Sequence, residues 1–141
     1  MEKGLIVFFG TSDLEATHRF YHDALELALE RDQGLCRIYQ VPGGGKIGFC
    51  THLEKVNGKK SPLLTLVTPE VDEWYRRLKE KGIQVEVPPV VNPLFGIYHF
   101  FLQDPNGYTV EIQRFVETQD SMHSHGKTAE SSGVRRKGAG E

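Results

Sequence analysis

The feature that most limits the possible folds is a repeated order of elements within residues 1–115. In each copy an apolar run typical of a strand precedes a helical pattern, and further strand-like runs follow the helix. The copies align at a constant offset of 57 residues, which pairs Ile6 with Leu63 (63 − 6). One copy alone would leave an apolar sheet face in water, so the two are expected to pair. The sequence therefore predicts one α+β domain with modules at about 4–52 and 61–115.

The first copy opens with Leu5–Phe9, a short apolar run that suits a buried strand. Ser12 and Glu15 then match a capping box, in which the Ser12 hydroxyl accepts from an early helix amide and Glu15 reaches back. The helix predicted from this start is followed by two strand-like runs joined by a glycine-rich turn. These runs are Leu35–Val41 and Lys46–Cys50.

The second copy opens with a strand-like run at Leu63–Val67. Thr68 is the expected N-cap of the next helix, with Pro69 in the first helical position and Gly82 at its end. Asp104–Gly107 is typical of a tight hairpin turn, because proline fixes φ and Asn-Gly tolerates positive φ. The strands expected after the helix are Ile83–Val87, Tyr98–Gln103 and Tyr108–Arg114.

Two segments resemble motifs of the glyoxalase/bleomycin-resistance/dioxygenase superfamily, also called the vicinal oxygen chelate superfamily. Ser12–Glu15, followed by Phe20-Tyr21 and Leu25–Leu27, is similar to its opening motif, and Asp104–Ile112 is similar to its closing motif. The resemblance implies two βαβββ modules forming a curled mixed sheet with a central cleft. Glu26 departs from the pattern, since the family usually has glycine there, and a local change in the turn is expected.

The resemblance also implies where metalloenzymes of this family bind a metal ion, at positions occupied here by Ile6, Leu63 and Glu111. Only Glu111 carries a donor atom, whereas a transition-metal site needs at least three convergent nitrogen or oxygen donors. The strand Lys46–Cys50, where a fourth ligand would lie, has no Asp, Glu or His. We therefore expect no family-type metal site and no cofactor, with a divalent metal at a non-standard site as the alternative.

Glu111 and His99 are the candidate catalytic residues. Strand alternation puts Glu111 and Gln113 on one face, and the resemblance makes that face, together with the face of His99 and Phe101, the cleft. A His–Glu pair there could transfer protons near neutral pH. The alternative for each is structural: a carboxylate bonded to neighbouring strands, and a half-buried histidine with one partner.

Further candidates for the cleft are aromatic, apolar or cationic. Arg37 and Tyr39 alternate together and would suit an anionic ligand, although a solvated outer face is the open alternative. His18 and His22 lie one helical turn apart, a spacing that allows metal binding, but a solvated helix face is expected. The full set of predicted ligand-binding residues is Ile6, Phe8, Arg37, Tyr39, Phe49, Leu63, Phe101 and Gln113.

Composition excludes several classes of function. The formal net charge is −2 without a basic stripe, which argues against nucleic-acid binding. No apolar run approaches the ~20 residues that cross a bilayer, and no signal peptide is evident, so a cytoplasmic location is expected. In a reducing cytoplasm Cys36 and Cys50 are expected to be free, packed thiols, with a disulfide as the alternative if their strands form a hairpin. Residues 116–141, rich in Gly, Ser and charge, are expected to be a disordered tail.

These observations support two functional hypotheses. The first is a metal-independent protein, similar to the bleomycin-resistance type, that binds a small amphipathic or aromatic molecule in its cleft, as a homodimer. The second is an enzyme of the glyoxalase, lyase or dioxygenase type that uses a non-standard metal site or acid/base chemistry by Glu111 and His99. Whether the protein is an enzyme stays open at this point.

Overall fold

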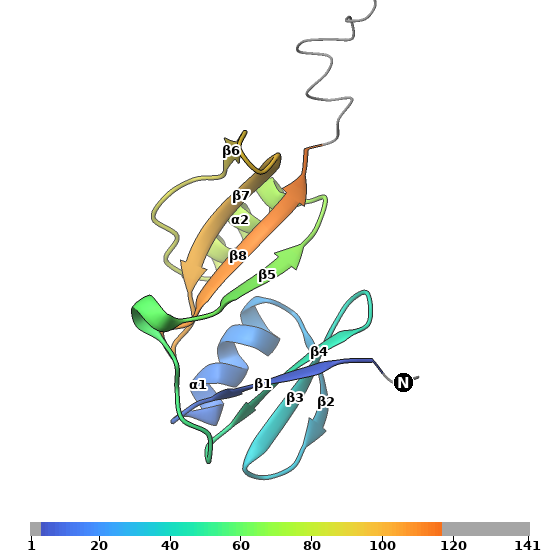
Figure 1. Cartoon of the computed structure of the whole chain (residues 1–141), viewed down its shortest axis with the longest axis vertical. Helices are drawn as coiled ribbons and strands as arrows, with labels where there is room; N and C mark the ends of the chain where they lie inside the picture. The colour runs from blue at the N-terminus through green and yellow to red at the C-terminus, as the bar shows by residue number, and fades with distance from the viewer. Residues whose placement is uncertain (1–3, 117–141) are drawn as a thin grey trace, which may run out of the picture.

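The computed structural model describes residues 4–116, which form two four-stranded mixed sheets (Figure 1). The first sheet has the order β1-β4-β3-β2 and the second the order β5-β8-β7-β6. Apart from Val116, the expected disordered tail lies outside the described residues. The strands are β1 (Ile6–Gly10), β2 (Ala28–Asp32), β3 (Cys36–Val41), β4 (Gly45–Cys50), β5 (Leu63–Val67), β6 (Val90–Asn92), β7 (Ile97–Gln103) and β8 (Thr109–Phe115).

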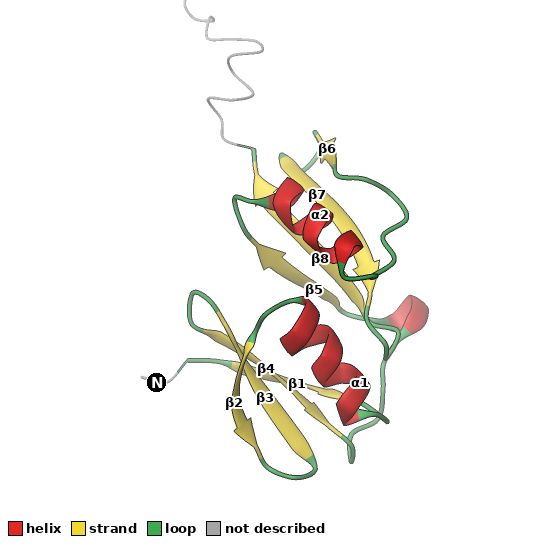
Figure 2. Cartoon of the chain, turned by 180° about the vertical axis from the view of Figure 1, so that it is seen from behind, coloured by secondary structure: helices red, strands yellow, loops and turns green. Residues whose placement is uncertain are grey.

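Both modules have the predicted βαβββ order, and in each the first strand pairs in parallel with the last. In the first module α1 (Leu14–His18) continues directly into a π-helical segment, η1 (Arg19–Ala24), and in the second α2 (Val71–Glu80) follows β5. One helical segment covers one face of each sheet (Figure 2). The expected α+β fold of two βαβββ modules is confirmed, and the sheets are not closed: among the described residues β1 and β5 are edge strands, each paired with one neighbour. A short 3₁₀ helix, η2 (Gly58–Lys60), lies in the connection between modules.

One strand prediction was wrong, and one strand was missed. Residues 83–87 are extended but unpaired, and the pairing with β7 begins only at Val90, after Pro88 and Pro89. Proline has no N–H to donate to a ladder, which explains the delay. In the first module the sequence analysis missed β2, whose polar residues give no clear alternation and whose register shifts between Leu29 and Arg31.

The helix starts also differ from prediction by one or two residues. Asp13, rather than Ser12, caps α1, because its Oδ1 accepts from the Ala16 amide at 2.9 Å. Thr68 accepts from the amide of Glu70 at 3.1 Å, and α2 begins only at Val71. In both cases a neighbouring polar side chain could serve as the cap, so the sequence pattern alone did not select one. The predicted turn at residues 104–107 is confirmed, with Gly107 at φ 89°.

A buried polar network joins the two modules. The Tyr21 hydroxyl of η1 donates to Asp104 Oδ2 at 2.7 Å, and Thr11 donates to Asn106 Oδ1 at 2.6 Å. Asp104 Oδ1 accepts the amides of Asn106 and Tyr108, both at 2.8 Å, so the carboxyl organises the β7–β8 turn from within. Burial raises the pKa of Asp104, although these donors oppose the shift. The turn of the second module is thereby fixed against the helix of the first.

Glu26 makes a second connection between the modules. It is the only non-glycine among the described residues with positive φ, 63°, at the position where the resemblance led us to expect a changed turn. Its carboxylate accepts from Arg77 of α2 at 2.5 Å and from Lys81 at 2.8 Å. The strain of positive φ costs roughly 1–2 kcal/mol, and the contacts with Arg77 and Lys81 offset part of it.

Cys36 and Cys50 form a disulfide across β3 and β4, which corrects the expectation of free thiols. The register pairs the two residues directly, so both side chains leave the sheet on the same face. The hairpin geometry, which the sequence analysis kept as the alternative, therefore decides the outcome. In addition, no helix among residues 4–116 is long and apolar enough to cross a membrane.

The pH dependence of stability tests the Glu26 contacts. Hydrogen bonds from Lys81 and then Arg77 lower the pKa of Glu26 below 4.5. A lowered folded-state pKa contributes stability above the unfolded value, and this contribution is lost as pH falls through the folded value. Glu26→Gln should therefore lower the free energy of unfolding near neutral pH by at most about 1 kcal/mol, seen as a lower urea midpoint. Well below pH 4.5 the variant and the unchanged chain should have the same stability.

The matched control is Glu86→Gln, an exposed carboxylate outside this cluster, for which the midpoint should change little at either pH. A deficit in Glu26→Gln that is equal at both pH values would contradict the assignment.

Candidate functional site

The second sheet has one side packed on α2 and one open side, and the register determines which residues lie on each. Val110 and Ile112 of β8 belong to the core that contains Leu78 of α2. Glu111 and Gln113 alternate with them and therefore lie on the opposite side, which we call the open face. The residues on the open face are Leu63, Thr65 and Val67 of β5, Thr109, Glu111 and Gln113 of β8, and His99 and Phe101 of β7.

The carboxylate of Glu111 is buried on this face, with 3% of the residue exposed. Its Oε1 accepts from the Thr65 hydroxyl at 2.7 Å, and its Oε2 lies 2.6 Å from Nδ1 of His99. Turned with its amide nitrogen inward, Gln113 donates to both carboxylate oxygens at 3.3 Å. The structure thus brings together the two predicted catalytic residues, and protein donors already occupy the carboxylate.

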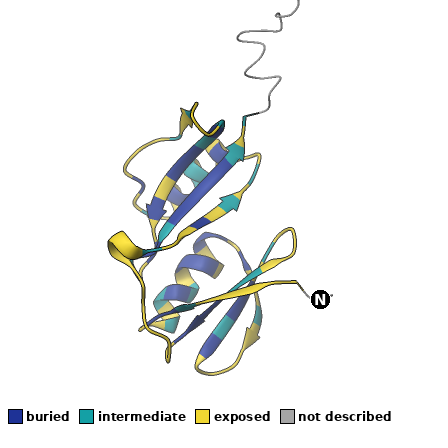
Figure 3. Cartoon of the chain, viewed as in Figure 1, coloured by how far each residue is buried: buried dark blue, intermediate teal, exposed yellow. Residues whose placement is uncertain are grey.

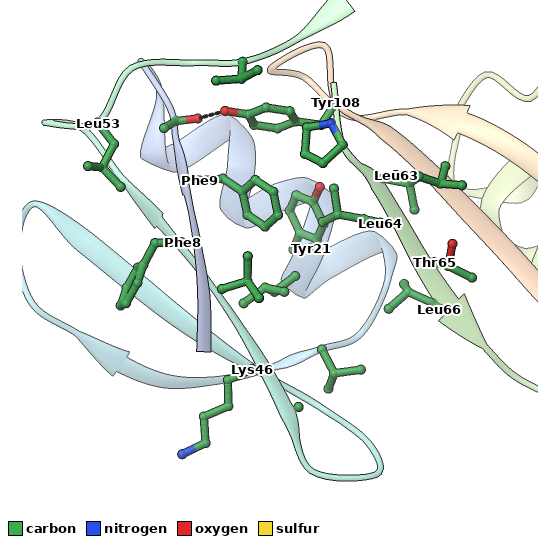
Figure 4. A pocket seen from close by; sticks show the side chains of 18 of the residues that line it. Phe8, Phe9, Tyr21, Lys46, Leu53, Leu63, Leu64, Thr65, Leu66 and Tyr108 are labelled. Atoms are coloured by element: carbon green, nitrogen blue, oxygen red, sulfur yellow. Dashed lines mark hydrogen bonds between the residues drawn. The ribbon is translucent and has the colours of Figure 1, made fainter. Parts of the chain in front are cut away.

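A cavity of about 890 Å³ opens between the edge strands β1 and β5 (Figure 4). It wraps around the edge of β1, so side chains from both faces of that strand line it. Two predicted ligand-binding residues, Phe8 and Leu63, lie on its wall. The other apolar residues of the lining include Leu5, Val7, Phe9, Ile47, Leu53, Val56, Leu64, Leu66 and Val110.

The wall of this cavity is fixed by hydrogen bonds and by one close backbone approach. The Tyr108 hydroxyl donates to the carbonyl of Gly10 at 2.6 Å (Figure 4). The loop after β4 passes directly over Gly10, where a Cβ would collide with the Leu53 carbonyl and with the backbone of Glu54. Only glycine allows the loop to approach this closely.

Thr65 connects the cavity to the buried pair. Its residue lines the cavity, while its hydroxyl donates to Glu111, which in turn contacts His99. His99 and Phe101 line a second hollow of about 1420 Å³, along the edge of β7 where β6 no longer pairs. The row Thr65–Glu111–His99 therefore crosses the open face from one hollow to the other. Sequence analysis missed Thr65, although its polar side chain in the run LLTLV was a usable signal.

The residues at the implied metal positions do not fit a metal ion. Leu63 shares the open face with Glu111, but the residue beside Glu111 across the strands is Thr65. Ile6 lies on the edge strand of the other sheet. With two aliphatic side chains and one carboxylate already bonded to protein, these positions supply too few donors for a transition metal. We therefore derive no chemistry through a metal at these positions.

Three predicted ligand-binding residues lie elsewhere, on the helix side of the first sheet. Arg37 makes an ion pair with Glu15 of α1 at 2.6 Å, and the Tyr39 hydroxyl lies 2.8 Å from Nδ1 of His18. Phe49 is fully buried and belongs to the core. The expectation that they line the cleft is corrected, because alternation groups them correctly but does not say which side faces the helix. Of the rest, Ile6, Phe8 and Phe101 are partly exposed, as a ligand surface requires.

Burial differs sharply between strands: β8 is largely buried, whereas β1 is largely exposed (Figure 3). The apolar core cluster lies on the helix sides of the two sheets. The edge strand β1 instead exposes Ile6, Val7 and Phe8. Leu63 and Val67 of β5 are likewise more than half exposed, at 53% and 60%. The two edge strands that flank the cavity are thus among the places where apolar surface remains uncovered.

The arrangement matches known proteins. A family model described as the Glyoxalase/Bleomycin resistance protein/Dioxygenase superfamily matches residues 6–112. A glyoxalase/bleomycin resistance protein/dioxygenase from Nocardioides is 22% identical, with a TM-score of 0.64 over 80% of this chain and 83% of its own. A glyoxalase/dioxygenase from Nostoc punctiforme is 19% identical, with a TM-score of 0.66 over 79% and 90%. A lactoylglutathione lyase from Agrobacterium tumefaciens is 21% identical, with a TM-score of 0.64 over 81% and 94%.

At these identities the solved structures establish the fold alone. The comparison with curated proteins gave no match.

The role of Glu111 in stability can be measured directly. Glu111→Ala should destabilise the protein by about 3 kcal/mol, because it leaves the buried ring of His99 without its partner and also removes the acceptor of the Thr65 hydroxyl. Thr65→Val keeps the shape and removes one donor, and should cost about 1 kcal/mol. Urea unfolding followed by circular dichroism gives both values. Equal costs for the two variants would show that Glu111 does not organise the open face.

Proposed function

The chain belongs to the Glyoxalase/Bleomycin resistance protein/Dioxygenase superfamily, and from this premise we propose that it binds a small amphipathic or aromatic molecule between β1 and β5 without a metal ion. The observation that carries the proposal is the apolar cavity of about 890 Å³ between two exposed edge strands. Ligand sites for small molecules are commonly ~300–1,000 Å³ and mostly apolar.

The polar groups around the cavity favour a ligand with an aromatic or aliphatic body and one anionic group. Lys60 and Lys46 lie in its lining, together with a single carboxylate, Glu54. The Lys46 ammonium is 2.9 Å from Glu30, which compensates its charge. Lys60 is therefore the residue best suited to meet an anionic group, while Phe8 provides a surface for stacking.

We also propose that the protein is a homodimer in which the second copy covers part of the uncovered edge surface. The support is that β1 and β5 are both edge strands and both expose apolar side chains, such as Val7 and Val67. Unprotected edges of this kind invite pairing with another chain. The cytoplasmic location expected from the sequence stays a prediction.

A direct binding assay tests the ligand proposal. We expect the anionic aromatic probe anilinonaphthalene sulfonate to bind the folded chain saturably, with the same affinity in the presence of a metal chelator. Leu63→Asp should weaken binding by about tenfold, because it replaces apolar contact in the cavity with a charge.

The matched control is Leu94→Asp, since Leu94 is 80% exposed and lies outside the cavity lining. A thermal melt of each variant verifies that it is folded at the assay temperature, so that probe binding to unfolded chain is excluded. Equal affinity in the two variants, or loss of binding on chelation, would contradict the proposal.

The dimer is tested by sedimentation velocity. The chain should sediment as a dimer, and Val67→Glu, which adds a charge to the exposed part of β5 outside the cavity lining, should shift it towards monomer. Leu94→Asp again serves as the control. A wild-type chain that sediments as a monomer at all concentrations would refute the proposal.

A second candidate function is acid/base catalysis, favoured by the 2.6 Å contact between His99 Nδ1 and Glu111 Oε2. In this alternative His99 would act from the second hollow, where Phe101 and Thr109 also lie. A His–carboxylate pair suits proton transfer, with Glu111 orienting the ring. The lyase and dioxygenase names of the solved structures belong to those proteins and give this chain no substrate.

A further inference from the structure

A second cluster of chemically reactive side chains lies on the first sheet, away from the Glu111–His99 pair. Cys36 of β3 and Cys50 of β4 are direct partners across the strands, with Cα atoms 4.1 Å apart. The amide of Thr51 donates to the Leu35 carbonyl at 2.9 Å, so the backbone hydrogen bonds between the strands are made by the neighbouring pair, Leu35 and Thr51. Cys36 and Cys50 therefore form a non-hydrogen-bonded pair, the position where opposed side chains come closest.

His52 completes the cluster. It follows Cys50 by two residues at the start of the loop after β4, and it is exposed while both cysteines are buried. One ring nitrogen of His52 and the two sulfur atoms all lie within 4.8 Å of one another. Two thiolates and one imidazole, supplied by adjacent strands and the turn that leaves them, form a donor set of the kind that zinc prefers.

We propose that Cys36, Cys50 and His52 bind a thiophilic divalent metal ion such as Zn²⁺ when the cysteines are reduced, and that disulfide formation abolishes this site. Zinc–sulfur bonds are ~2.3 Å and zinc–nitrogen bonds ~2.0–2.1 Å, and rotation of the two Cys side chains separates the sulfur atoms without moving the strands. Three protein ligands leave the fourth position for water or an added ligand.

The chemistry balances with either a thiol or a phosphine as the reductant. A phosphine takes the oxygen of one water molecule to become the phosphine oxide, and the two hydrogens of that water end on the two cysteine thiols. Two thiol molecules convert the Cys36–Cys50 disulfide into two thiols and are themselves joined as a disulfide, a transfer of two electrons and two protons. Metal binding then releases both thiol protons, because the thiolate is the ligand. With two thiolates and a neutral His52 as ligands, the complex of Zn²⁺ and its three protein ligands has no net charge.

The other group with metal-like proximity, His18, His22 and Asp23, is a weaker candidate. Nδ1 of His18 already contacts the Tyr39 hydroxyl, and Nδ1 of His22 contacts Asp23, both at 2.8 Å. The two rings stack with centroids 4.4 Å apart and an angle of 11° between their planes. These donors are engaged with protein partners, so His22 is a suitable control.

The cysteine site adjoins the cavity without being part of it. Cys50 pairs with Gly10 of β1, and the loop that begins beyond His52 supplies Leu53 and Glu54 to the cavity wall. The inference does not depend on the proposed ligand, because metal binding is measured without one.

The test is a Zn²⁺ titration of the full chain against a chromophoric chelator. Protein reduced with a phosphine should bind one Zn²⁺ per chain, and protein oxidised to the disulfide should not compete with the chelator. His52→Ala and Cys36→Ser should each weaken binding at least about tenfold, the loss that even an outer partner of a metal ligand produces. With Co²⁺, the reduced chain should show thiolate-to-metal charge-transfer absorption.

His22→Ala should bind Zn²⁺ as the unchanged chain does. His123→Ala/His125→Ala controls for histidines outside the described residues. Circular dichroism verifies the fold of every variant, and His52 is exposed, so its replacement tests the ligand rather than the core. Equal binding by oxidised and reduced protein, undiminished binding by His52→Ala, or no binding by the reduced chain would each overturn the proposal.

Discussion

The fold depends on the hydrogen bonds that join Tyr21 to Asp104 and Thr11 to Asn106. They connect the first module to the β7–β8 turn of the second in a buried region where an unpaired polar group would be costly. The edge strands β1 and β5 belong to different sheets, and residues of both line the cavity. The cavity between them is thus a result of how the modules dock, rather than of either module alone.

On the open face, one residue of β8, Glu111, contacts both a neighbouring strand and the imidazole of His99. Glu111 is satisfied by Thr65 and His99, which removes the cost of burying a carboxylate and also fixes the imidazole. A metalloprotein would need the same carboxylate free to bind an ion. The aliphatic residues at positions 6 and 63 and the internal partners of Glu111 therefore point the same way, because neither leaves a set of free donors for an ion.

Much of the fold could be predicted from the sequence, since apolar periodicity and the Asp104–Gly107 turn are local signals. The proximity of His99 and Glu111 was also predicted, from strand alternation together with the resemblance, which indicated the faces that line the cleft. Arg37 and Tyr39 were predicted to bind ligand with a solvated outer face as the open alternative, because alternation defines two faces without naming the one that packs on the helix. In the structure both contact the helical segment. The disulfide was kept only as an alternative, because free thiols were expected in a reducing cytoplasm. The strand register, which the sequence did not fix, places Cys36 directly opposite Cys50.

Gly10 has a consequence for how the cavity can vary. The loop backbone at Leu53 and Glu54 occupies the space that a Cβ at this position would need. Even one methyl group would displace the loop as a whole, since backbone cannot rotate aside as a side chain can. Any residue larger than glycine at position 10 would therefore push the segment that follows β4 away from β1, and the part of the cavity wall formed by Leu53 and Glu54 would move with it.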